Sequence, residues 1–325
     1  MRLTSLLFFS VLIATTACKR KTQTAVTTKP YPTVAEQRAA LQNISRTAAP
    51  RILDSAAIIS NLEYLSAAAT EGRKPGTTGH QLALSMVVNE MRKTGVDSLG
   101  NSIVQQFNGK IVNGTNAGTN VIGLLRGTGN SDKYIVVTAH YDHLGKTSTG
   151  EIFHGADDNS SGTAALLAMA DYFRNHPVGY SLLFVALDRE ESGLEGAHAF
   201  VQQFATAQNI NVLMNINMDM IARSDKNELF AAGIFHYPSL SYLVENNRSK
   251  TTLALLMGHD TGSQTDDWTM QSDHAAFHAK KIPFLYFGVE DHPDYHKVTD
   301  TFDKINYSRF VEACNLIALV IKSVK

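Results

Sequence analysis

Histidine and carboxylate side chains stand in this sequence at positions where they could bind a divalent metal ion. Five of them follow apolar runs or open a helical segment: His140, Asp158, Glu191, Asp219 and His296. Taken singly, each would be interpreted as a helix cap, a turn residue or a solvated side chain. Charged residues rarely follow buried strands so consistently unless they pair with each other or with a cation. Because imidazole and carboxylate ligands together suit zinc and similar metals, whereas calcium prefers oxygen, the pattern predicts a zinc-like site.

Apolar runs of strand length must position these side chains. They lie at 120–125, 134–139, 181–187, 212–218 and 282–289. Helical patterns lie between several of them, notably at 161–173 and 194–203. Continuous apolar runs are typical of strands buried on both faces, and their alternation with helices indicates parallel pairing. We therefore predict an α/β fold with a mixed, largely parallel central sheet that is flanked by helices on both faces.

The carboxyl ends of the strands are the place where ligands bind in open α/β sheets. Four predicted strands are followed by His or acidic residues, namely His140, Glu191, Asp219 and His296. Asp158 belongs to the acidic cluster that opens the helical segment at 161–173. We therefore expect all five side chains to meet at one edge of the sheet.

The remaining segments carry weaker signals. Helical patterns cover 34–70 and 79–94, and Gly and Pro residues predict a loop at 71–76. A polar interruption at 258–273 is either a substrate-facing loop or a solvated surface insertion. Cys314 lies in a predicted amphipathic helix at 310–324, where we interpret it as a small buried apolar residue and not as a nucleophile.

The N-terminus has the pattern of an export signal. Arg2 precedes an apolar stretch, residues 3–13, that is too short to span a bilayer, and small residues follow before Cys18. This resembles a bacterial lipoprotein signal, although Thr15 stands where Leu is usual. We predict a signal peptide at 1–17, a tether at 18–33 and a single domain at 34–325, anchored to a membrane by lipid on Cys18 and facing the periplasm or cell surface. Plain secretion or a retained anchor is the alternative.

Composition excludes some partners. The chain has 325 residues, of which 44% are hydrophobic and 18% charged, as in ordinary globular proteins. The formal net charge is -1 and there is no basic stripe with interleaved aromatics, so we expect no nucleic-acid partner. The sequence also lacks a Gly-x-Ser-x-Gly elbow, a Walker loop and a His-Glu-x-x-His helix. These absences argue against a serine hydrolase, a P-loop nucleotidase and the commonest single-zinc proteases.

Short motifs give the chain a family resemblance. They are Ala-His-Tyr-Asp-His at 139–143, Gly-Ala-Asp-Asp-Asn-Ser-Ser-Gly at 155–162, Glu-Glu-Ser-Gly-Leu-Glu-Gly at 190–196, Asn-Met-Asp-Met-Ile at 217–221, and Tyr-His at 295–296 followed by Asp-Thr at 300–301. In this order they resemble metallopeptidase family 28, the co-catalytic zinc aminopeptidases, over roughly residues 55 to 325. The resemblance implies a zinc-exopeptidase, phosphorylase/hydrolase-like fold and makes 34–325 a single zinc peptidase catalytic domain.

The resemblance also implies a role for each ligand. Asp158 would bridge two zinc ions. His140 and Asp219 would complete one site, and Glu191 and His296 the other. Each ion would then have three protein ligands and one open position, as catalytic zinc requires.

Three further residues take roles from the same resemblance. Glu190 would be the general base and acid. Tyr295 would steady the developing oxyanion. Asp142, two residues after His140, would orient its imidazole, although a simple turn carboxylate is the alternative.

Other histidines lie near the motifs. His292 is the rival of His296, and we prefer His296 because of Tyr295 before it and the Asp-Thr pair after it. His143, His154 and His274 are not needed as ligands by the family pattern.

The implied activity is hydrolysis of peptide bonds, with release of N-terminal residues from peptides that have a free N-terminus. A glutaminyl cyclase with a single zinc and a catalytically inactive binding domain of the same fold are the alternatives, and the complete set of five ligand positions argues against both. Carboxypeptidase or dipeptidase action stays open, as does the substrate side chain.

Overall fold

A computed structural model describes residues 31–262 and 266–325 of the chain. The predicted signal peptide at 1–17, Cys18 and residues 19–30 of the predicted tether lie outside the described residues. Within the described ranges, no helix combines the length and apolar character needed to cross a bilayer.

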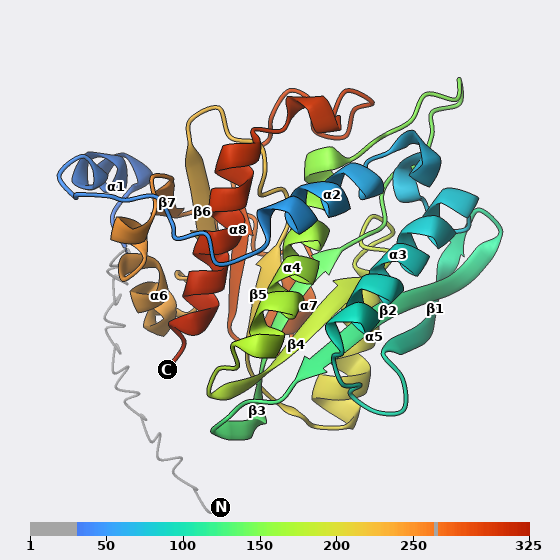
Figure 1. Cartoon of the computed structure of the whole chain (residues 1–325), viewed down its shortest axis with the longest axis horizontal. Coiled ribbons are helices and arrows are strands. Elements are labelled where there is room, and N and C mark those ends of the chain that lie inside the picture. Colours follow the sequence, from blue (N-terminus) through green and yellow to red (C-terminus); the bar gives the residue numbers. More distant parts are fainter. Residues whose placement is uncertain (1–30, 263–265) are drawn as a thin grey trace, which may run out of the picture.

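A single eight-stranded mixed sheet forms the centre of the molecule (Figure 1), in the order β1-β2-β4-β3-β5-β8-β6-β7. Its neighbours β4, β3, β5 and β8 are mutually parallel, while β1, β2 and β6 run antiparallel to their inner neighbours. The α/β prediction is therefore confirmed. The strands are β1 (Val104–Val112), β2 (Thr115–Leu125), β3 (Asn130–His140), β4 (Tyr180–Leu187), β5 (Asn211–Met218), β6 (Glu228–Ala232), β7 (Ala254–Met257) and β8 (Phe284–Gly288).

The five apolar runs of the sequence all form strands, namely β2, β3, β4, β5 and β8. Three strands lacked a recognisable pattern: β1, β6 and β7. β1 alternates between covered and exposed positions because it lies at an edge of the described sheet, where β2 is its neighbour. β6 and β7 have five and four residues, which is too short for a period to stand out.

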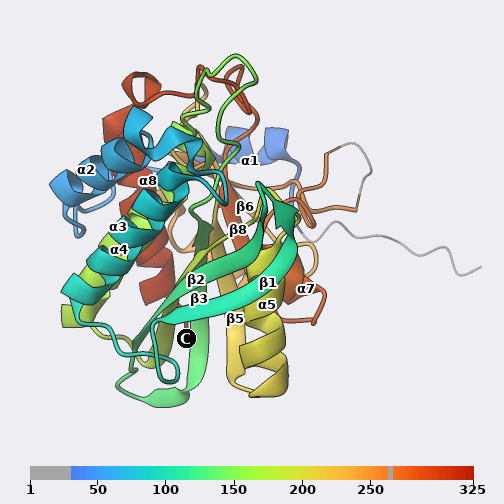
Figure 2. The ribbon, with the colours of Figure 1, turned by 90° about the vertical axis from the view of Figure 1, so that its right-hand side faces the viewer.

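Helices cover both faces of the sheet, as predicted. α2, α3, α4 and α8 lie on one face, and α5 and α7 lie on the other (Figure 2). The helices are α1 (Val34–Leu41), α2 (Ser55–Leu65), α3 (Thr78–Thr94), α4 (Gly162–Asn175), α5 (Glu195–Phe200), α6 (Ser241–Glu245), α7 (His274–His278) and α8 (Tyr307–Lys322). α8 contains Cys314, which is fully buried and has no disulfide partner among the described residues.

The helical prediction for 34–70 is wrong in its middle. α1 ends at Leu41, and α2 begins only at Ser55. Pro50 disfavours a helix through this region because it lacks an amide hydrogen and restricts the preceding residue. α2 then starts on Asp54, whose carboxylate accepts hydrogen bonds from the amides of Ala56 and Ala57. The prediction for 79–94 is confirmed by α3, which ends on Gly95 at φ +67°.

The predicted loop at 71–76 begins inside a 3-10 turn, η1 (Ala68–Arg73). Glu71, Gly72 and Arg73 have positive φ angles there, so the chain reverses sharply before α3. Gly72 is required because a Cβ at this position would lie 2.2 Å from the carbonyl oxygen of Gly145.

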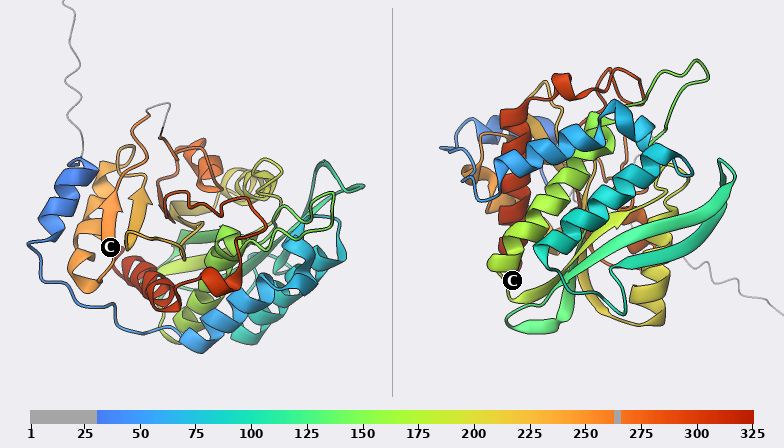
Figure 3. Two further views of the ribbon diagram at one scale, coloured as in Figure 1. Left: turned by 90° about the horizontal axis from the view of Figure 1, so that it is seen from above. Right: turned by 45° about the vertical axis from the view of Figure 1, so that its right-hand side comes forward.

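The N-terminal helix protects one edge of the sheet. Seen from above, α1 flanks the β7 edge, while the β1–β2 hairpin forms the opposite edge (Figure 3). The side chain of Gln37 donates to the carbonyl of Met257 and accepts from its amide, at 2.7 and 2.9 Å. These bonds occupy backbone groups of β7 that would otherwise offer an edge for pairing with another chain.

The sheet order creates a crevice at the carboxyl edge. β3 lies between β4 and β5, so the chain leaves β3 toward one side for β4 and returns to the other side for β5. Open α/β sheets bind ligands at such a switch point, because the loops diverge there.

Candidate metal centre

The five predicted ligand side chains all reach the carboxyl edge of the sheet. His140 is the last residue of β3, Glu191 follows β4, and Asp219 directly follows β5. Asp158 lies in a π-helical turn, η2 (Ala156–Ser161), that leads into α4. His296 lies in the segment after β8.

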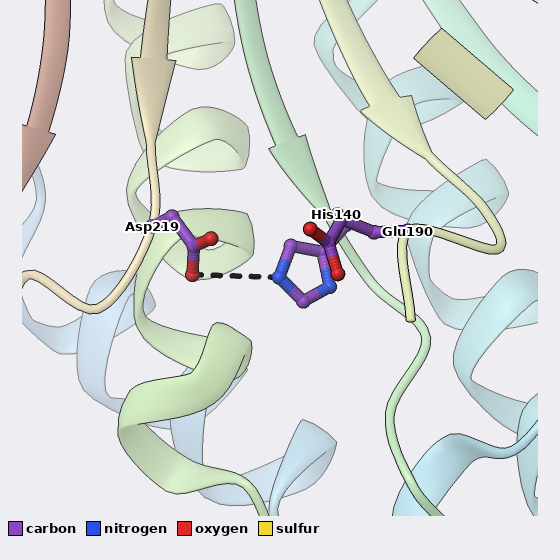
Figure 4. Close-up of side chains that lie close together, drawn as sticks. All are labelled: His140, Glu190 and Asp219. Carbon is purple, nitrogen blue, oxygen red and sulfur yellow. Dashed lines mark ion pairs between the residues drawn. The ribbon is translucent and has the colours of Figure 1, made fainter. Parts of the chain in front are cut away.

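His140, Asp158 and Asp219 form a first set of ligand atoms. Nε2 of His140 lies 3.4 Å from Oδ1 of Asp219 and 3.5 Å from Oδ1 of Asp158. Figure 4 shows the carboxylate of Asp219 directed at the His140 ring. All three residues are buried. The set thus directs one imidazole nitrogen and two carboxylate oxygens at a common point.

A second set uses the other oxygen of the same aspartate. Nε2 of His296 lies 3.1 Å from Oδ2 of Asp158 and 3.6 Å from Oε2 of Glu191. Asp158 therefore presents Oδ1 to the first set and Oδ2 to the second. His296 is the most open member, with 40% of its side chain exposed.

These spacings fit zinc. Tetrahedral ligands at about 2.0–2.1 Å from the ion lie about 3.3 Å from one another, and the separations here are 3.1–3.6 Å. Oδ2 of Asp158 and Oδ1 of Asp219 are buried, and in the described part of the chain neither accepts a well-aligned hydrogen bond, their close polar neighbours being the imidazole nitrogens of His296 and His140. Buried carboxylate oxygens without a partner are costly unless a cation neutralises them. The donor set therefore suits bound divalent metal.

Electrostatics point the same way. Burial raises the pKa of Glu191 to about 7, and burial also raises the pKa of Glu190 well above its ordinary value. For Glu190, the His140 imidazole opposes this rise, and the nearby carboxylates of Asp273 and Asp219 add to it. So many acids in one cavity disfavour their own ionisation, and a divalent cation would restore the charged forms.

Glu190 lies beside the first set. One of its carboxylate oxygens is within 4.8 Å of a ligand atom of His140 and of Asp219. Its amide donates to Oδ1 of Asp142 at 3.0 Å, so Asp142 helps to hold the loop that carries Glu190. The same Oδ1 lies 3.7 Å from Nδ1 of His140. That Nδ1 makes its hydrogen bond with the main-chain oxygen of Asp142, at 3.2 Å.

The segment after β8 separates the two rival histidines. His292 directs Nε2 at Oδ2 of Asp157, at 3.2 Å. His296, by contrast, lies within 3.6 Å of both Asp158 and Glu191. Tyr295 stacks on the His296 ring with 4.0 Å between centroids and lines the cavity above the carboxylates.

His143, to which the sequence motifs assign no role, lies beside the candidate ligands Asp158 and Glu191. Its Nδ1 is 2.8 Å from Oε1 of Glu191 and 3.7 Å from Oδ2 of Asp158. The ring is buried, and burial lowers the pKa of His143 to about 3. The sequence feature that could have pointed to His143 is its position three residues after the candidate ligand His140. His154 and His274, in contrast, contact the main-chain oxygens of Ser66 and Trp268.

A cavity of about 370 Å³ opens over both sets. In addition to the five candidate ligands and Glu190, the lining includes apolar and aromatic residues, namely Leu194, Met220, Trp268, Tyr286, Val289 and Tyr295. It also includes two polar residues, Gln271 and Asp291. Trp268 and Gln271 come from the polar segment 258–273, so this part of that segment borders the cavity. Trp268 stacks flat on His259, with 3.8 Å between centroids.

Strained backbone surrounds the ligands. Arg189, Met220 and His296 have φ angles of +63°, +57° and +53°, and each is a candidate ligand or lies within two residues of one. Left-handed conformations of such residues are unfavourable and cluster at functional sites, where the surrounding structure imposes them. Arg189 and Met220 turn the chain immediately beyond β4 and β5. The neighbouring residues Glu191 and Asp219 line the cavity.

An α/β sheet with clustered imidazole and carboxylate groups at its carboxyl edge defines the class of this protein. Residues 120–321, more than half of the chain, match the model of peptidase family M28. The chain therefore belongs to this family, which confirms the resemblance drawn from the motifs.

Two individual relatives match large parts of the chain. The chain is 31% identical over 216 residues to "Aminopeptidase YwaD" of Bacillus subtilis, covering 63% of this chain and 45% of the relative. It is 26% identical over 170 residues to the "Alkaline phosphatase isozyme conversion protein" of Escherichia coli, covering 48% of each. The chain thus spans about half the length of the curated relatives it matches.

Solved structures share the fold. A leucine aminopeptidase precursor from Bacteroides thetaiotaomicron superposes with a TM-score of 0.68 at 17% identity, covering 84% of this chain and 98% of that one. A glutaminyl cyclase from the same organism superposes equally well, with a TM-score of 0.67 at 16% identity and coverage of 84% and 99%. The fold alone therefore does not separate the two activities.

Proposed function

We propose that this chain is a two-zinc peptidase that hydrolyses peptide bonds and releases N-terminal residues. The observation that carries the proposal is that both groups of candidate ligands share Asp158. Its two oxygens face two separate imidazole–carboxylate sets, at spacings that suit tetrahedral zinc. The names of the B. subtilis aminopeptidase and of two Pyrenophora proteins called probable zinc metalloproteases support the assignment.

The protein side chains would divide the work. His140, Asp219 and Asp158 would hold one ion, and Glu191, His296 and Asp158 the other. Bound zinc would supply Lewis-acid chemistry, polarising the scissile carbonyl and making a water molecule easier to deprotonate. Glu190 would accept that proton and deliver it to the leaving amine, since one of its carboxylate oxygens lies beside the ligand atoms of His140 and Asp219. Tyr295 would donate a hydrogen bond to the developing oxyanion.

The cavity supports an exopeptidase specificity. Its walls include the exposed carboxylate of Asp291, which can attract the ammonium group of a free N-terminus. The cavity is also lined by Met220, Trp268 and Tyr286, which offer apolar surface to the side chain of the first substrate residue. A peptide with a free amine and an apolar first residue fits this mixture.

The direct test is a panel of matched peptides assayed with and without a chelator. We expect the purified chain to release the first residue from a free peptide and to lose this activity when a chelator removes its metal. The N-acetylated form of the same peptide should be a poor substrate, because its neutral amide cannot pair with the acidic cavity. A glutaminyl peptide in the panel reports cyclisation separately from hydrolysis.

The outcomes separate the alternatives. Cleavage of acetylated peptides at internal bonds would refute release of N-terminal residues while leaving a metallopeptidase. A pyroglutamyl product without hydrolysis of any peptide would make the chain a cyclase. Bound zinc with no turnover on the whole panel would identify an inactive binding domain.

We further propose that the chain is exported and anchored to a membrane through lipid on Cys18. The support is the sequence pattern of Arg2, residues 3–13 and the small residues before Cys18. In a bacterial host, the wild-type chain should sediment with membranes, and Cys18→Ser should retain its signal peptide and incorporate no labelled fatty acid. Equal labelling of both forms would exclude Cys18 as the lipid site.

A further inference from the structure

Arg73 has an unusual set of partners. It is fully buried at the end of η1, yet its guanidinium forms no hydrogen bond or ion pair with any carboxylate in the described ranges. All five of its N–H groups donate instead to main-chain oxygens. Their partners, at 2.7–3.1 Å, are the carbonyls of Leu65, Tyr141, His154, Gly155 and Asp158.

Four of the five carbonyls belong to the two segments that carry His140 and Asp158, and the fifth, that of Leu65, lies at the end of α2. Tyr141 directly follows His140 at the end of β3, and Asp158 is the ligand common to both sets. Nε of Arg73 bonds to the first of these carbonyls at 2.9 Å, and Nη2 bonds to the second at 3.1 Å. One rigid planar group thus spans the two segments.

Other contacts lock the same residue in place. The main-chain oxygen of Arg73 accepts from the amide of His143 at 3.2 Å. Gly155 leaves room for the guanidinium, since a Cβ there would lie 2.7 Å from Nη2. Arg73 itself has φ +51°, a conformation that a residue adopts only when its surroundings impose it.

The charge of Arg73 persists in the interior. Burial lowers its pKa to about 10, against the opposing effect of the carboxylates of Asp158, Asp142, Asp300 and Glu191. The group is therefore a cation at neutral pH. It has two conceivable effects on metal affinity, because its charge opposes a nearby metal cation while its hydrogen bonds hold the ligand segments in place.

We propose that Arg73 is a positioning residue of the metal centre, whose guanidinium sets the spacing between His140 and the shared ligand Asp158. The proposal rests on the proposed function for the existence of the metal centre. Positioning should outweigh charge because one hydrogen bond goes to the carbonyl of the shared ligand itself. Partners that orient metal ligands typically contribute tenfold to hundredfold in metal affinity.

The test uses cobalt(II), whose visible absorption reports ligand geometry, bound to the full chain without substrate. Arg73→Lys keeps the charge but offers three donors on a flexible stem in place of five in a planar fork. Arg73→Met removes both the charge and the donors. We expect both variants to bind cobalt about tenfold to hundredfold more weakly and to show altered absorption bands.

Arg248→Lys is the matched control. Unlike the fully buried Arg73, Arg248 is only partly buried, but it too donates to a main-chain oxygen, that of Leu255, and it donates to the side chain of Gln37 beside the β7 edge. We expect this variant to lose stability while its cobalt affinity and spectrum stay those of the wild type.

Several results would overturn the positioning role. Tighter cobalt binding by Arg73→Met with unchanged binding by Arg73→Lys would show that charge alone acts. A wild-type spectrum and affinity in both would remove Arg73 from the centre. If Arg73→Lys does not fold, Arg73→Gln takes its place, because its amide still donates two bonds. Failure of all three to fold, while Arg248→Lys folds, would assign Arg73 a purely structural role. Absence of cobalt binding by the wild type would instead contradict the proposed metal centre.

Discussion

Glu190→Gln is expected to retain the metal content of the wild type and to lose on the order of 10²–10⁴-fold in kcat, the usual contribution of a general acid–base group. The amide is nearly isosteric with the carboxylate but cannot accept the proton. Because Glu190 is mostly buried and its amide is held by Asp142, the substitution should leave the loop in place.

The same variant distinguishes a base from a ligand. A carboxylate oxygen of Glu190 lies close enough to His140 and Asp219 to share a metal ion with them. If Glu190 were a ligand, the variant would contain less metal than the wild type. Metal per chain, measured by elemental analysis, therefore decides between the two roles before any assay of turnover.

Glu290→Gln provides the control for the loss of one negative charge. Glu290 lies after β8 and pairs with Lys226 at 2.7 Å, outside the lining of the cavity. Near-normal turnover in both variants would remove Glu190 from the mechanism. A similar loss in both would attribute the effect to overall charge.

Asp158→Asn is expected to abolish tight binding of both ions, because each oxygen of Asp158 faces a different ligand set. The neutral amide offers only one oxygen. A metal ion contributes several kcal/mol to transition-state stabilisation, so kcat/KM should fall on the order of a thousandfold or more. Zinc should also cease to raise the melting temperature, since a ligand stabilises only the state that binds it.

Two histidine variants complete this experiment. His296→Ala should remove one ion and leave the other, because only the second set contains this imidazole. His292→Ala is the matched control from the same segment, since His292 contacts Asp157 and belongs to neither set. Isothermal titration with zinc measures the stoichiometry. Two ions retained by Asp158→Asn, or one ion in the wild type, would contradict a shared centre.

Much of this architecture was predictable because it is local. The five central runs have strand length and are largely apolar, which favours burial on both faces. The polar residues Asn215 and Asn217 within β5 are buried as well, and both form hydrogen bonds there. The residues that follow β3, β4, β5 and β8 share one edge of the sheet, since these four parallel strands end together. The motifs around His140, Asp158, Glu191, Asp219 and His296 then sufficed to indicate the family, which the family match confirms.

Strands β1, β6 and β7 were not predictable from the sequence pattern. β6 and β7 owe their conformation to pairing with partners distant in sequence, such as Ala231 with Phe287. The break between α1 and α2 depends on Pro50, but also on the packing of α1 against β7 through Gln37. Such pairings exist only in the assembled sheet.

The metal-ligand candidates show the same division. The sequence alone determined which residue types stand at the strand ends, because that depends on order along the chain. Only the tertiary structure decided that His296 faces Asp158 while His292 faces Asp157, since four residues in a loop have no fixed period. The tertiary structure also places His143 against Glu191, and it places Arg73 within hydrogen-bond distance of the Asp158 carbonyl. Contacts between residues 48 or more positions apart, as His143 and Glu191 are, depend on how the strands assemble into the sheet, which no local pattern encodes.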